Sequence, residues 1–520
     1  MKKILHWADN EVQNLIRVRG NKKKYICASG VTPSGTIHIG NFREMITADL
    51  IVRALKDKGK DTRFIHSWDD NDVFRKIPKN LPNQEQLKKE LRKPIYLIKD
   101  PFKKYKSYAE HFEKEIEKEL PILGINPEYI YQHKLYSSCK YAKEIKIALE
   151  QKEKIIKILN NYRKEPLSKN WLPIFVFCNK CNRDTTKKIN YLGNYEIYYE
   201  CECGHKETFD FRKKGIVTLR WRIDWPMHWQ FYNEDFESAG KDHFAAGGSI
   251  TTAKQIQKEI YNTDPPYGFA YEWISPKGLG QFSSSSGNVI TLSQMMEIYE
   301  PELIRWIFAS TRPNTEFTIS FDADVIKLYE DFDRTERIYF KKEKVSEKRY
   351  KKEKRIYELS IIDPKKIPKK IPFQPSFRYL TNILLMNQLD ISKSFKHYKK
   401  NIKTKLDEKK LKTRIVCAKN WLEKYAPENF KYSINKKSPK VPIKYKKIFN
   451  EISKLLKKKK YTEKELHNEF YNLINKYKLD NKEFFKYSYK ILINKEKGPK
   501  LARFILDLES KAINLFDSLS

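Results

Sequence analysis

The sequence predicts an α/β protein in which a parallel-sheet domain is interrupted by a cysteine-bearing insertion and followed by an α-helical C-terminal domain. Three observations predict this order: a strand–loop–helix–strand pattern over residues 25–67, four cysteines within a β-rich stretch at 171–215, and Lys-rich helical spacing over 376–520. At 520 residues, of which 40% are hydrophobic, the chain can form several packed domains, and this excludes wholesale disorder.

The first domain begins with a pattern typical of a βαβ unit. An apolar strand at Tyr25–Ala28 leads through the loop SGVTPSGTIHIGN to a helix that starts near Asn41 and ends before Gly59, a residue suited to a left-handed C-terminal position. Strand-like residues return over 62–67. Because a crossover helix joins parallel strands, this order predicts a parallel pair. Another amphipathic helix is predicted at 141–165.

The insertion, residues 171–215, contains four cysteines whose spacing suits a zinc site. Two pairs, Cys178-x-x-Cys181 and Cys201-x-Cys203, form two knuckles that fit tetrahedral thiolate coordination, although the second is shorter than the usual CxxC. His205 is an alternative fourth ligand. The competing interpretation is a β-hairpin with reduced cysteines. Since nothing suggests a reactive metal-bound water, we expect a structural Zn²⁺.

The second half of the sheet domain is predicted over residues 216–320. A central strand is expected at 216–221, with Trp221 at its end because Pro226 argues against a continuous helix through the three tryptophans. The tract GKDHFAAGGS then precedes a helix for which Ser249 is the expected cap, and another strand is expected at 269–274. The domain boundaries are therefore 1–170, 171–215 and 216–320, with a charged connector at 321–375 before the helical 376–520.

The charge balance favours a polyanion partner. Lys and Arg number 104 against 66 Asp and Glu, a formal net charge of +38, which attracts RNA or DNA. The alternative is a coding bias that enriches Lys, Ile, Asn and Tyr. Acidic residues at positions 9 and 11 argue against a signal peptide, and no apolar stretch is long enough to span a membrane, so we expect a soluble cytoplasmic protein.

The loop between the first strand and helix is the strongest candidate for phosphate chemistry. Backbone N–H groups at a helix N-terminus attract anions, and His38 can donate a hydrogen bond or a positive charge to phosphoryl oxygens in a transition state. A tight turn with an incidental histidine is the alternative. The candidate ATP-binding residues here are Pro33, Ser34, Gly35, His38, Gly40 and Asn41, of which His38 and Asn41 are also candidate catalytic residues.

The tract from Thr32 to Asn41 resembles the HIGH signature of class I aminoacyl-tRNA synthetases, in the form HIGN. A downstream serine loop, QFSSSSGN, looks like the family's KMSKS element but carries Gln281 and Ser284 where the family usually has lysines; Lys277 lies just upstream. A low-complexity serine linker is the alternative. The resemblance makes Ser284 and Ser285 candidate catalytic residues and extends the ATP-binding set to Ser283, Ser284, Ser285, Ser286, Gly287 and Asn288.

Further tracts over nearly the whole chain resemble the class I lysyl-tRNA synthetases, among them SWDDNDVFRKIP, LRWRIDWPMHW, GKDHFAAGGS and WLEKYAPE. By this resemblance Gly30, Thr32, Trp221 and His243 are candidates for a lysine pocket, and Asp242 and Gly247 for the nucleotide. Asp69, Asp70 and Asp224 are added on physical grounds, because a buried lysine ε-ammonium requires a carboxylate partner.

The resemblance implies a Rossmann-type catalytic domain and an α-helical anticodon-binding domain. The implied activity is ATP-dependent activation of L-lysine to lysyl-adenylate and its transfer to tRNA(Lys), with Mg²⁺ arriving on ATP and no obligate protein partner. One alternative is a class I synthetase for another amino acid, glutamate, whose carboxylate would call for arginine in the pocket. The other is a catalytically inactive tRNA-binding paralogue without the loop lysines.

Overall fold

The computed structural model describes residues 6–277 and 289–519. The chain divides into two compact units. Unit 1 comprises Met1–Met296, Pro301–Ser320 and Arg334–Lys369, and unit 2 comprises Glu297–Glu300, Phe321–Asp333 and Lys370–Ser520. In the described ranges, no helix combines the length and the apolar character needed to cross a membrane.

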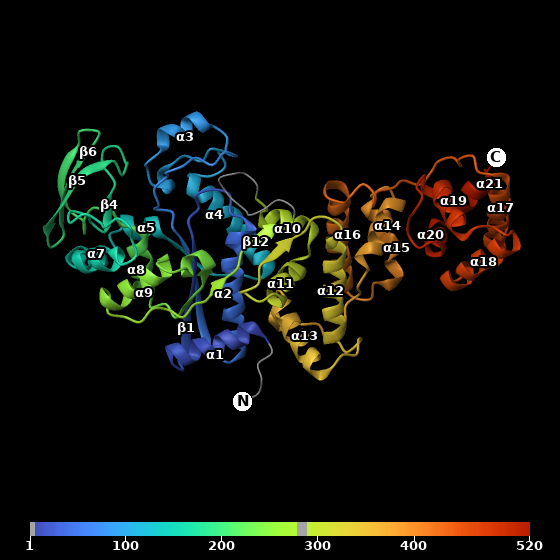
Figure 1. Ribbon diagram of the computed structural model, residues 1–520, viewed down its shortest axis with the longest axis horizontal. Helices are drawn as coiled ribbons and strands as arrows, with labels where there is room; N and C mark the ends of the chain where they lie inside the picture. The colour runs from blue at the N-terminus through green and yellow to red at the C-terminus, as the bar shows by residue number, and fades with distance from the viewer. Residues whose placement is uncertain (1–5, 278–288, 520) are drawn as a thin grey trace. The chain divides into compact units, whose positions relative to one another are not determined.

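Unit 1 is built on a four-stranded parallel sheet in the order β3 (Glu128–Tyr131), β2 (Asp61–Trp68), β1 (Lys24–Val31), β9 (Phe236–Glu237). Strands β1 and β2 pair from Lys24 opposite Asp61 to Val31 opposite Trp68, and α2 (Ile39–Asp57) is their crossover (Figure 1). The predicted βαβ unit is confirmed. Gly59 has φ +74°, so it holds the left-handed position that the sequence predicted after the helix.

Two short parallel pairs form separate sheets, β10 (Ala239–Gly240) with β11 (Ala270–Tyr271) and β12 (Ile274–Pro276) with β13 (Phe317–Ile319). The strand predicted at 269–274 is therefore two strands in different pairs. Helices of unit 1 before the insertion are α1 (Trp7–Arg19), α3 (Gln84–Glu90), α4 (Tyr108–Glu119), α5 (Gln132–Ser137), α6 (Ala142–Glu150) and α7 (Lys152–Asn160). The single helix predicted at 141–165 is thus two helices that meet at Gln151.

The insertion forms its own antiparallel strands (Figure 1, green). A three-stranded sheet contains β5 (Thr186–Gly193), β6 (Glu196–Cys201) and β7 (Lys206–Asp210), and a separate pair joins β4 (Ile174–Val176) to β8 (Val217–Leu219). The prediction of a central strand at 216–221 is wrong. Strand β9 pairs with β1 in the parallel sheet. Strand β8 instead pairs with β4, so the two strands at the ends of the insertion lie side by side.

Helix α8 (Trp221–Tyr232) runs without interruption through Pro226. The prediction that Trp221 ends a strand is therefore wrong, because β8 stops at Leu219 and Trp221 is the first helical residue. A proline inside a helix removes the hydrogen bond of its own N–H and crowds the carbonyl four residues before it. Burial of Ile223, Met227 and Trp229, each at most 2% exposed, offsets that loss. Helix α9 (Ser249–Glu259) follows.

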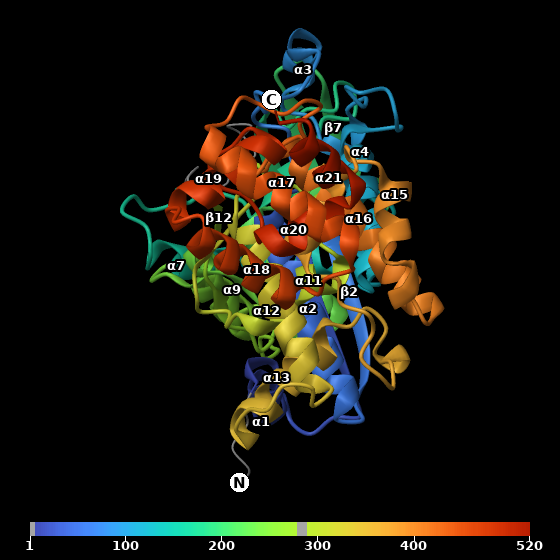
Figure 2. The ribbon, with the colours of Figure 1, turned by 90° about the vertical axis from the view of Figure 1, so that its right-hand side faces the viewer.

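The remaining helices are α10 (Leu292–Ile298), α11 (Pro301–Ser310), α12 (Asp324–Tyr339) and α13 (Glu347–Ser360). Unit 2 is helical, as predicted, with α14 (Phe377–Met386), α15 (Ile391–His397), α16 (Lys405–Lys424), α17 (Ile443–Lys458), α18 (Glu463–Lys476), α19 (Asn481–Ile493), α20 (Leu501–Leu508) and α21 (Ser510–Asp517). Helices α17 to α21 gather into one bundle (Figure 2, red). Within it the Phe449 ring stacks on Phe484 and Phe516, with centroids 5.5 and 5.2 Å away.

Candidate active site

A cavity of about 940 Å³ opens in unit 1 at the carboxyl ends of β1 and β2. The end of β1 contributes Gly30 and the following Thr32, the end of β2 contributes Ser67 and the following Asp69, and α8 forms another side. This edge is where parallel α/β sheets bind their ligands, because the strands diverge there and the connecting loops supply polar groups.

One wall of this cavity is acidic. Six carboxylates line it: Glu44, Asp69, Asp72, Asp224, Glu234 and Glu237. Burial raises the pKa of Asp69 and of Glu44 to about 8 and that of Asp72 to about 6. His228 forms an ion pair with Asp224 at 3.3 Å; although burial lowers its pKa, Asp224 and Asp69 raise it overall. A cation entering this wall would be stabilised, whereas an anion would be repelled.

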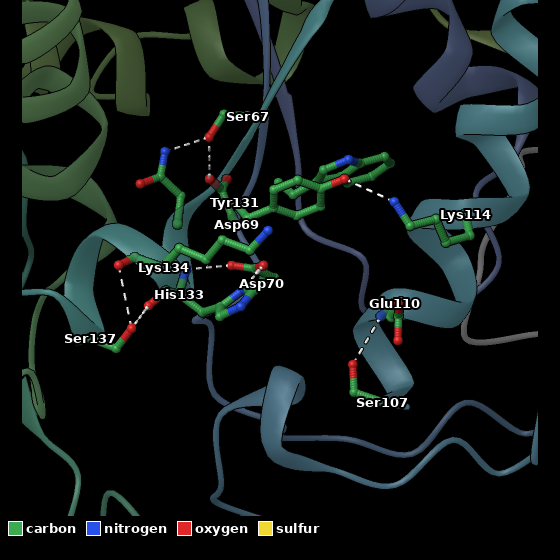
Figure 3. Close-up of polar contacts among 12 residues, drawn as sticks. Ser67, Asp69, Asp70, Ser107, Glu110, Lys114, Tyr131, His133, Lys134 and Ser137 are labelled. Atoms are coloured by element: carbon green, nitrogen blue, oxygen red, sulfur yellow. Dashed lines mark hydrogen bonds and ion pairs between the residues drawn. The ribbon is translucent and has the colours of Figure 1, made fainter. Parts of the chain in front are cut away.

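Helix α5 holds two of these carboxylates in place. Gln132 Nε2 donates to Ser67 Oγ at 2.7 Å, and Ser67 Oγ donates to Asp69 Oδ1 at 3.1 Å (Figure 3). Four residues further along, the Tyr136 hydroxyl donates to Asp224. The orientation of Asp69 and Asp224 is therefore set by a helix that is not itself part of the cavity wall.

Asp70, the third predicted aspartate, has a different position. Its side chain is fully buried and accepts hydrogen bonds from the His133 backbone N–H, at 2.6 Å, and from the His133 ring (Figure 3). His133 lies in α5. Asp70 does not line the cavity but anchors the start of the helix that orients Asp69.

Three more of the acidic residues are held by donors from several elements. The Gly30 N–H and the Tyr271 hydroxyl donate to the two oxygens of Glu44 at 2.7 and 3.0 Å, and Thr32 Oγ1 donates to Asp72 at 2.9 Å. In addition, the indole N–H groups of Trp225 and Trp229 both donate to Glu237 Oε2. Trp225 and Trp229 of α8 therefore hold Glu237 in position in addition to packing in the core.

The HIGN loop caps α2. His38 is the N-cap residue, its Nδ1 accepts from the Gly40 N–H at 3.1 Å, and its own N–H donates to Asn41 Oδ1 at 3.2 Å. Burial lowers the pKa of His38 to about 4. At neutral pH the ring is therefore uncharged, with its proton on Nε2. Of the two roles predicted for His38, which were to donate a hydrogen bond or to supply a positive charge, only the hydrogen bond remains. A Cβ at Gly40 would lie 2.8 Å from the His38 ring, which explains the glycine.

The remaining predicted residues fall into three groups. Ser34, Asn41, Trp221, His243 and Gly247 line the cavity with Gly30 and Thr32, whereas Pro33, Gly35, His38, Gly40 and Asp242 do not. The serine loop, with Ser283, Ser284, Ser285, Ser286, Gly287 and Asn288, lies outside the described residues. Ser249 is not the cap of α9: Gly248 is, and the Ser249 hydroxyl instead lies 2.7 Å from His243 Nδ1.

The four clustered cysteines come together as a possible metal site. Their sulfur atoms all lie within 4.8 Å of one another, with Cys178–Cys203 at 3.6 Å and Cys181–Cys201 at 3.7 Å. Four sulfurs at about 2.3 Å from a tetrahedral Zn²⁺ would be about 3.8 Å apart, so the set fits zinc. His205 instead lies 3.4 Å from Glu207, and the four thiols form the group without it.

Comparison with known proteins identifies the family. Residues 5–363 match the family model described as tRNA synthetases class I (K). The chain belongs to the class I lysyl-tRNA synthetases. It is 49% identical to a lysine–tRNA ligase of Borreliella burgdorferi over 97% of both chains. It is also 44% identical to that of Treponema pallidum (97% and 96%) and 40% identical to that of Pyrococcus horikoshii (97% and 98%).

The sequence analysis predicted only part of the acidic wall, namely Asp69 and Asp224. Glu44, Asp72, Glu234, Glu237 and His228 were missed. A usable signal existed for Asp72 and Glu44, which lie within the tracts SWDDNDVF and HIGNFRE. His228 likewise lies within the tract LRWRIDWPMHW, whereas Glu234 and Glu237 had no such signal, because they reach the cavity only through the placement of β9.

Proposed function

We propose that the chain is a lysine–tRNA ligase that activates L-lysine with ATP to lysyl-adenylate and transfers the lysyl group to tRNA(Lys). The observation that carries this function is the acidic cavity wall, which lies beside the HIGN helix start and suits a cationic amino acid. The names of the relatives, which match almost the full length of the chain, support the same activity.

In the proposed lysine pocket, Asp69 receives the substrate ε-ammonium. Asp224 is less available, because it already accepts a hydrogen bond from Tyr136 and forms an ion pair with His228. The role of Asp224 is then to keep His228 protonated within the wall. Gly30, Thr32, Trp221 and His243 enclose the rest of the substrate, since they line the same cavity.

ATP is proposed to bind over the start of α2. The backbone from Pro33 to Gly35 and the helix N-terminus with Gly40 and Asn41 face its phosphates. Asp242 and Gly247 are proposed near the nucleoside, and Ser283, Ser284, Ser285, Ser286, Gly287 and Asn288 are proposed to contact the triphosphate. Mg²⁺ enters with ATP as part of the substrate.

In the activation step, a lysine carboxylate oxygen bonds to the α-phosphorus, and the bond from that phosphorus to the bridging oxygen breaks and releases pyrophosphate. His38 Nε2–H donates to phosphoryl oxygens as their charge grows, and Asn41 holds the His38 backbone. In transfer, a terminal ribose oxygen of the tRNA bonds to the lysyl carbonyl carbon. AMP leaves with the electron pair of the broken C–O bond, and the hydroxyl proton passes to a phosphate oxygen or to water. Positioning and electrostatics suffice, so no protein nucleophile is needed.

Two further assignments extend this function beyond the cavity. Cys178, Cys181, Cys201 and Cys203 are proposed to hold a structural Zn²⁺, because their sulfur spacing fits four-coordinate zinc. The Lys-rich helices over 376–520 are proposed to bind the anticodon by phosphate contacts and aromatic stacking. The enzyme is proposed to act in the cytoplasm, where tRNA is charged for translation, without an obligate protein partner.

ATP–pyrophosphate exchange and tRNA charging test the function directly. With purified protein, exchange measured with and without tRNA should depend on lysine and not on glutamate, and tRNA(Lys) should become lysylated. Exchange that glutamate supports would establish the glutamate alternative. Binding of tRNA without exchange or charging under any of these conditions would establish the inactive paralogue.

A further inference from the structure

A chain of buried hydroxyl and amide groups leads to Asp69 from residues outside the cavity lining. It starts at Tyr232, the last residue of α8, and passes through Tyr141 and Gln132 to Ser67. Tyr232, Ser67 and Asp69 line the cavity, whereas Gln132 and Tyr141 do not. Because Gln132 and Tyr141 are at most 1% exposed, their hydrogen bonds are made within the protein rather than to bulk solvent.

Each link in this chain has the length of an ordinary hydrogen bond. The hydroxyl oxygens of Tyr232 and Tyr141 lie 3.0 Å apart, and the Tyr141 hydroxyl donates to Gln132 Oε1 at 2.7 Å. Gln132 Nε2 donates to Ser67 Oγ at 2.7 Å. Ser67 Oγ in turn donates to Asp69 Oδ1 at 3.1 Å (Figure 3). The chain is therefore continuous from the end of α8 to the carboxylate.

The number of protons on each group gives every hydrogen bond in the chain a single direction. The amide oxygen of Gln132 has no proton, so it accepts that of Tyr141, and the Tyr141 oxygen accepts from Tyr232. The amide nitrogen of Gln132 can only donate, so Ser67 Oγ accepts from it and gives its single proton to Asp69. All the donors thus point towards the carboxylate.

Helix α5 is held in place around Gln132. The next residue, His133, donates to Asp70 through its backbone N–H at 2.6 Å and through its ring. At the other end of the helix, a Cβ at Gly215 would lie 2.2 Å from the Tyr136 carbonyl oxygen, so the chain that leaves the insertion packs directly against the α5 backbone. These contacts fix the position from which Gln132 reaches Ser67.

We propose that Gln132 is a positioning residue for lysine activation: by donating to Ser67, it directs the Ser67 proton to Asp69 and so prepares that carboxylate for the substrate ε-ammonium. The inference rests on the proposed function, in which Asp69 receives the ammonium. A hydrogen bond donated to a carboxylate favours its charged form, which is the form that binds a cation. Glutamine suits this position, because an ionised glutamate could only accept and would take the Ser67 proton away from Asp69.

Lysine-dependent ATP–pyrophosphate exchange by the full-length enzyme, with tRNA(Lys) present, tests the inference. Gln132→Met should raise the KM for lysine by about three- to tenfold, as expected for loss of one hydrogen bond. The kcat and the KM for ATP should stay within about twofold, because the ammonium is bound equally in the ground and transition states. Ser67→Ala should raise the KM for lysine at least as much. The double variant should be no worse than Ser67→Ala, because Gln132 acts through Ser67.

The pH profile of the KM for lysine is a readout that a merely structural role would not move. Burial raises the pKa of Asp69 to about 8, and the Ser67 hydrogen bond lowers it, so losing that bond raises it further. The fall in KM with rising pH should therefore move to higher pH in Gln132→Met and in Ser67→Ala. The other charged groups around Asp69 are common to all variants: Asp72, Asp224, His228, Glu44 and Glu234.

Gln257→Met is the matched control. Gln257 is also 1% exposed, and it donates to Thr263 at 2.5 Å, away from the cavity lining. This variant should keep the KM for lysine and the pH profile of the wild type, and an effect equal to that of Gln132→Met would overturn the inference.

Three further results would overturn it. One is an unchanged KM for lysine in folded Gln132→Met. Another is a double variant whose KM rises by the product of the two single effects, because Gln132 would then act independently of Ser67. The third is an unshifted pH profile in Ser67→Ala, which decides the question even if Gln132→Met does not fold. A wild type without lysine-dependent exchange would instead count against the proposed function, which distinguishes the two.

Discussion

Asp69→Asn tests the lysine pocket with a nearly isosteric change. The asparagine can still accept the Ser67 hydrogen bond, so the position of the side chain is retained while its negative charge is lost. A hydrogen bond to a charged group contributes about 1.5–3 kcal/mol, and each 1.4 kcal/mol is a factor of ten in binding. The KM for lysine should therefore rise by about 10- to 150-fold, with a much smaller change for ATP.

The pH dependence of the KM for lysine gives a second, independent test of the role of Asp69. Because burial raises the pKa of Asp69 to about 8, the empty pocket is protonated there at pH 6 and must release a proton when the ammonium binds. The KM for lysine should fall as pH rises towards about 8 and level off above it. Asp72 and Asp224 raise this pKa further and His228 lowers it, while Glu44 titrates in the same range, so Asp69→Asn should flatten the profile without abolishing it.

Steady-state lysylation of tRNA(Lys) between pH 6 and 9 measures both effects. Asp61→Asn is the matched control, since Asp61 lies on the same strand β2 but is exposed at its far end. An Asp69→Asn enzyme whose KM for lysine and pH profile equal those of the wild type and of Asp61→Asn would refute the assignment of Asp69 to the ammonium.

Three further predictions concern other parts of the molecule. His38→Ala should leave ATP and lysine binding within a few-fold and slow adenylate formation by about a hundredfold or more in rapid kinetics; unchanged kinetics would remove His38 from the mechanism. Metal analysis of freshly purified, reduced enzyme should find about one Zn per chain, and Cys178→Ser/Cys201→Ser should lose it; active protein without zinc would contradict the structural site. Arg414→Ala should destabilise unit 2 by about 3–5 kcal/mol in urea unfolding, because Glu300 and Asp333 would be left buried and unpaired. The exposed Arg378→Ala should cost under about 1 kcal/mol, and equal effects would show that the buried pairs contribute little.

The sequence predicted those features of the fold that depend on neighbouring residues. The βαβ unit followed from an apolar strand, a helix-period segment and a glycine at the left-handed position, all within about 45 residues. The thiol cluster followed from cysteine spacing in a β-rich stretch. The errors at Pro226 and Ser249 have a common cause: local preferences were weighed without the tertiary contacts that stabilise α8 as a helix and direct the Ser249 hydroxyl to His243.

The candidate site was predictable only where a motif marked it. His38 and Asn41 lie in a contiguous tract whose spacing defines a loop before a helix, and their mutual cap is a local interaction. Glu237 reaches the cavity because a two-residue strand pairs with β1, and its partners Trp225 and Trp229 lie on a helix whose existence the sequence argued against. Such a residue becomes visible only when the register of the sheet is known.

The raised pKa values of the acidic wall explain how six carboxylates can share one cavity before lysine binds. At neutral pH the acidic wall is partly protonated when empty, because burial raises the pKa values of its carboxylates, and this limits the repulsion that six ionised groups would exert on one another. Binding of the ammonium favours their ionised forms. The acidic wall thus gains negative charge as the cationic amino acid arrives, so its carboxylates repel one another little while the pocket is empty.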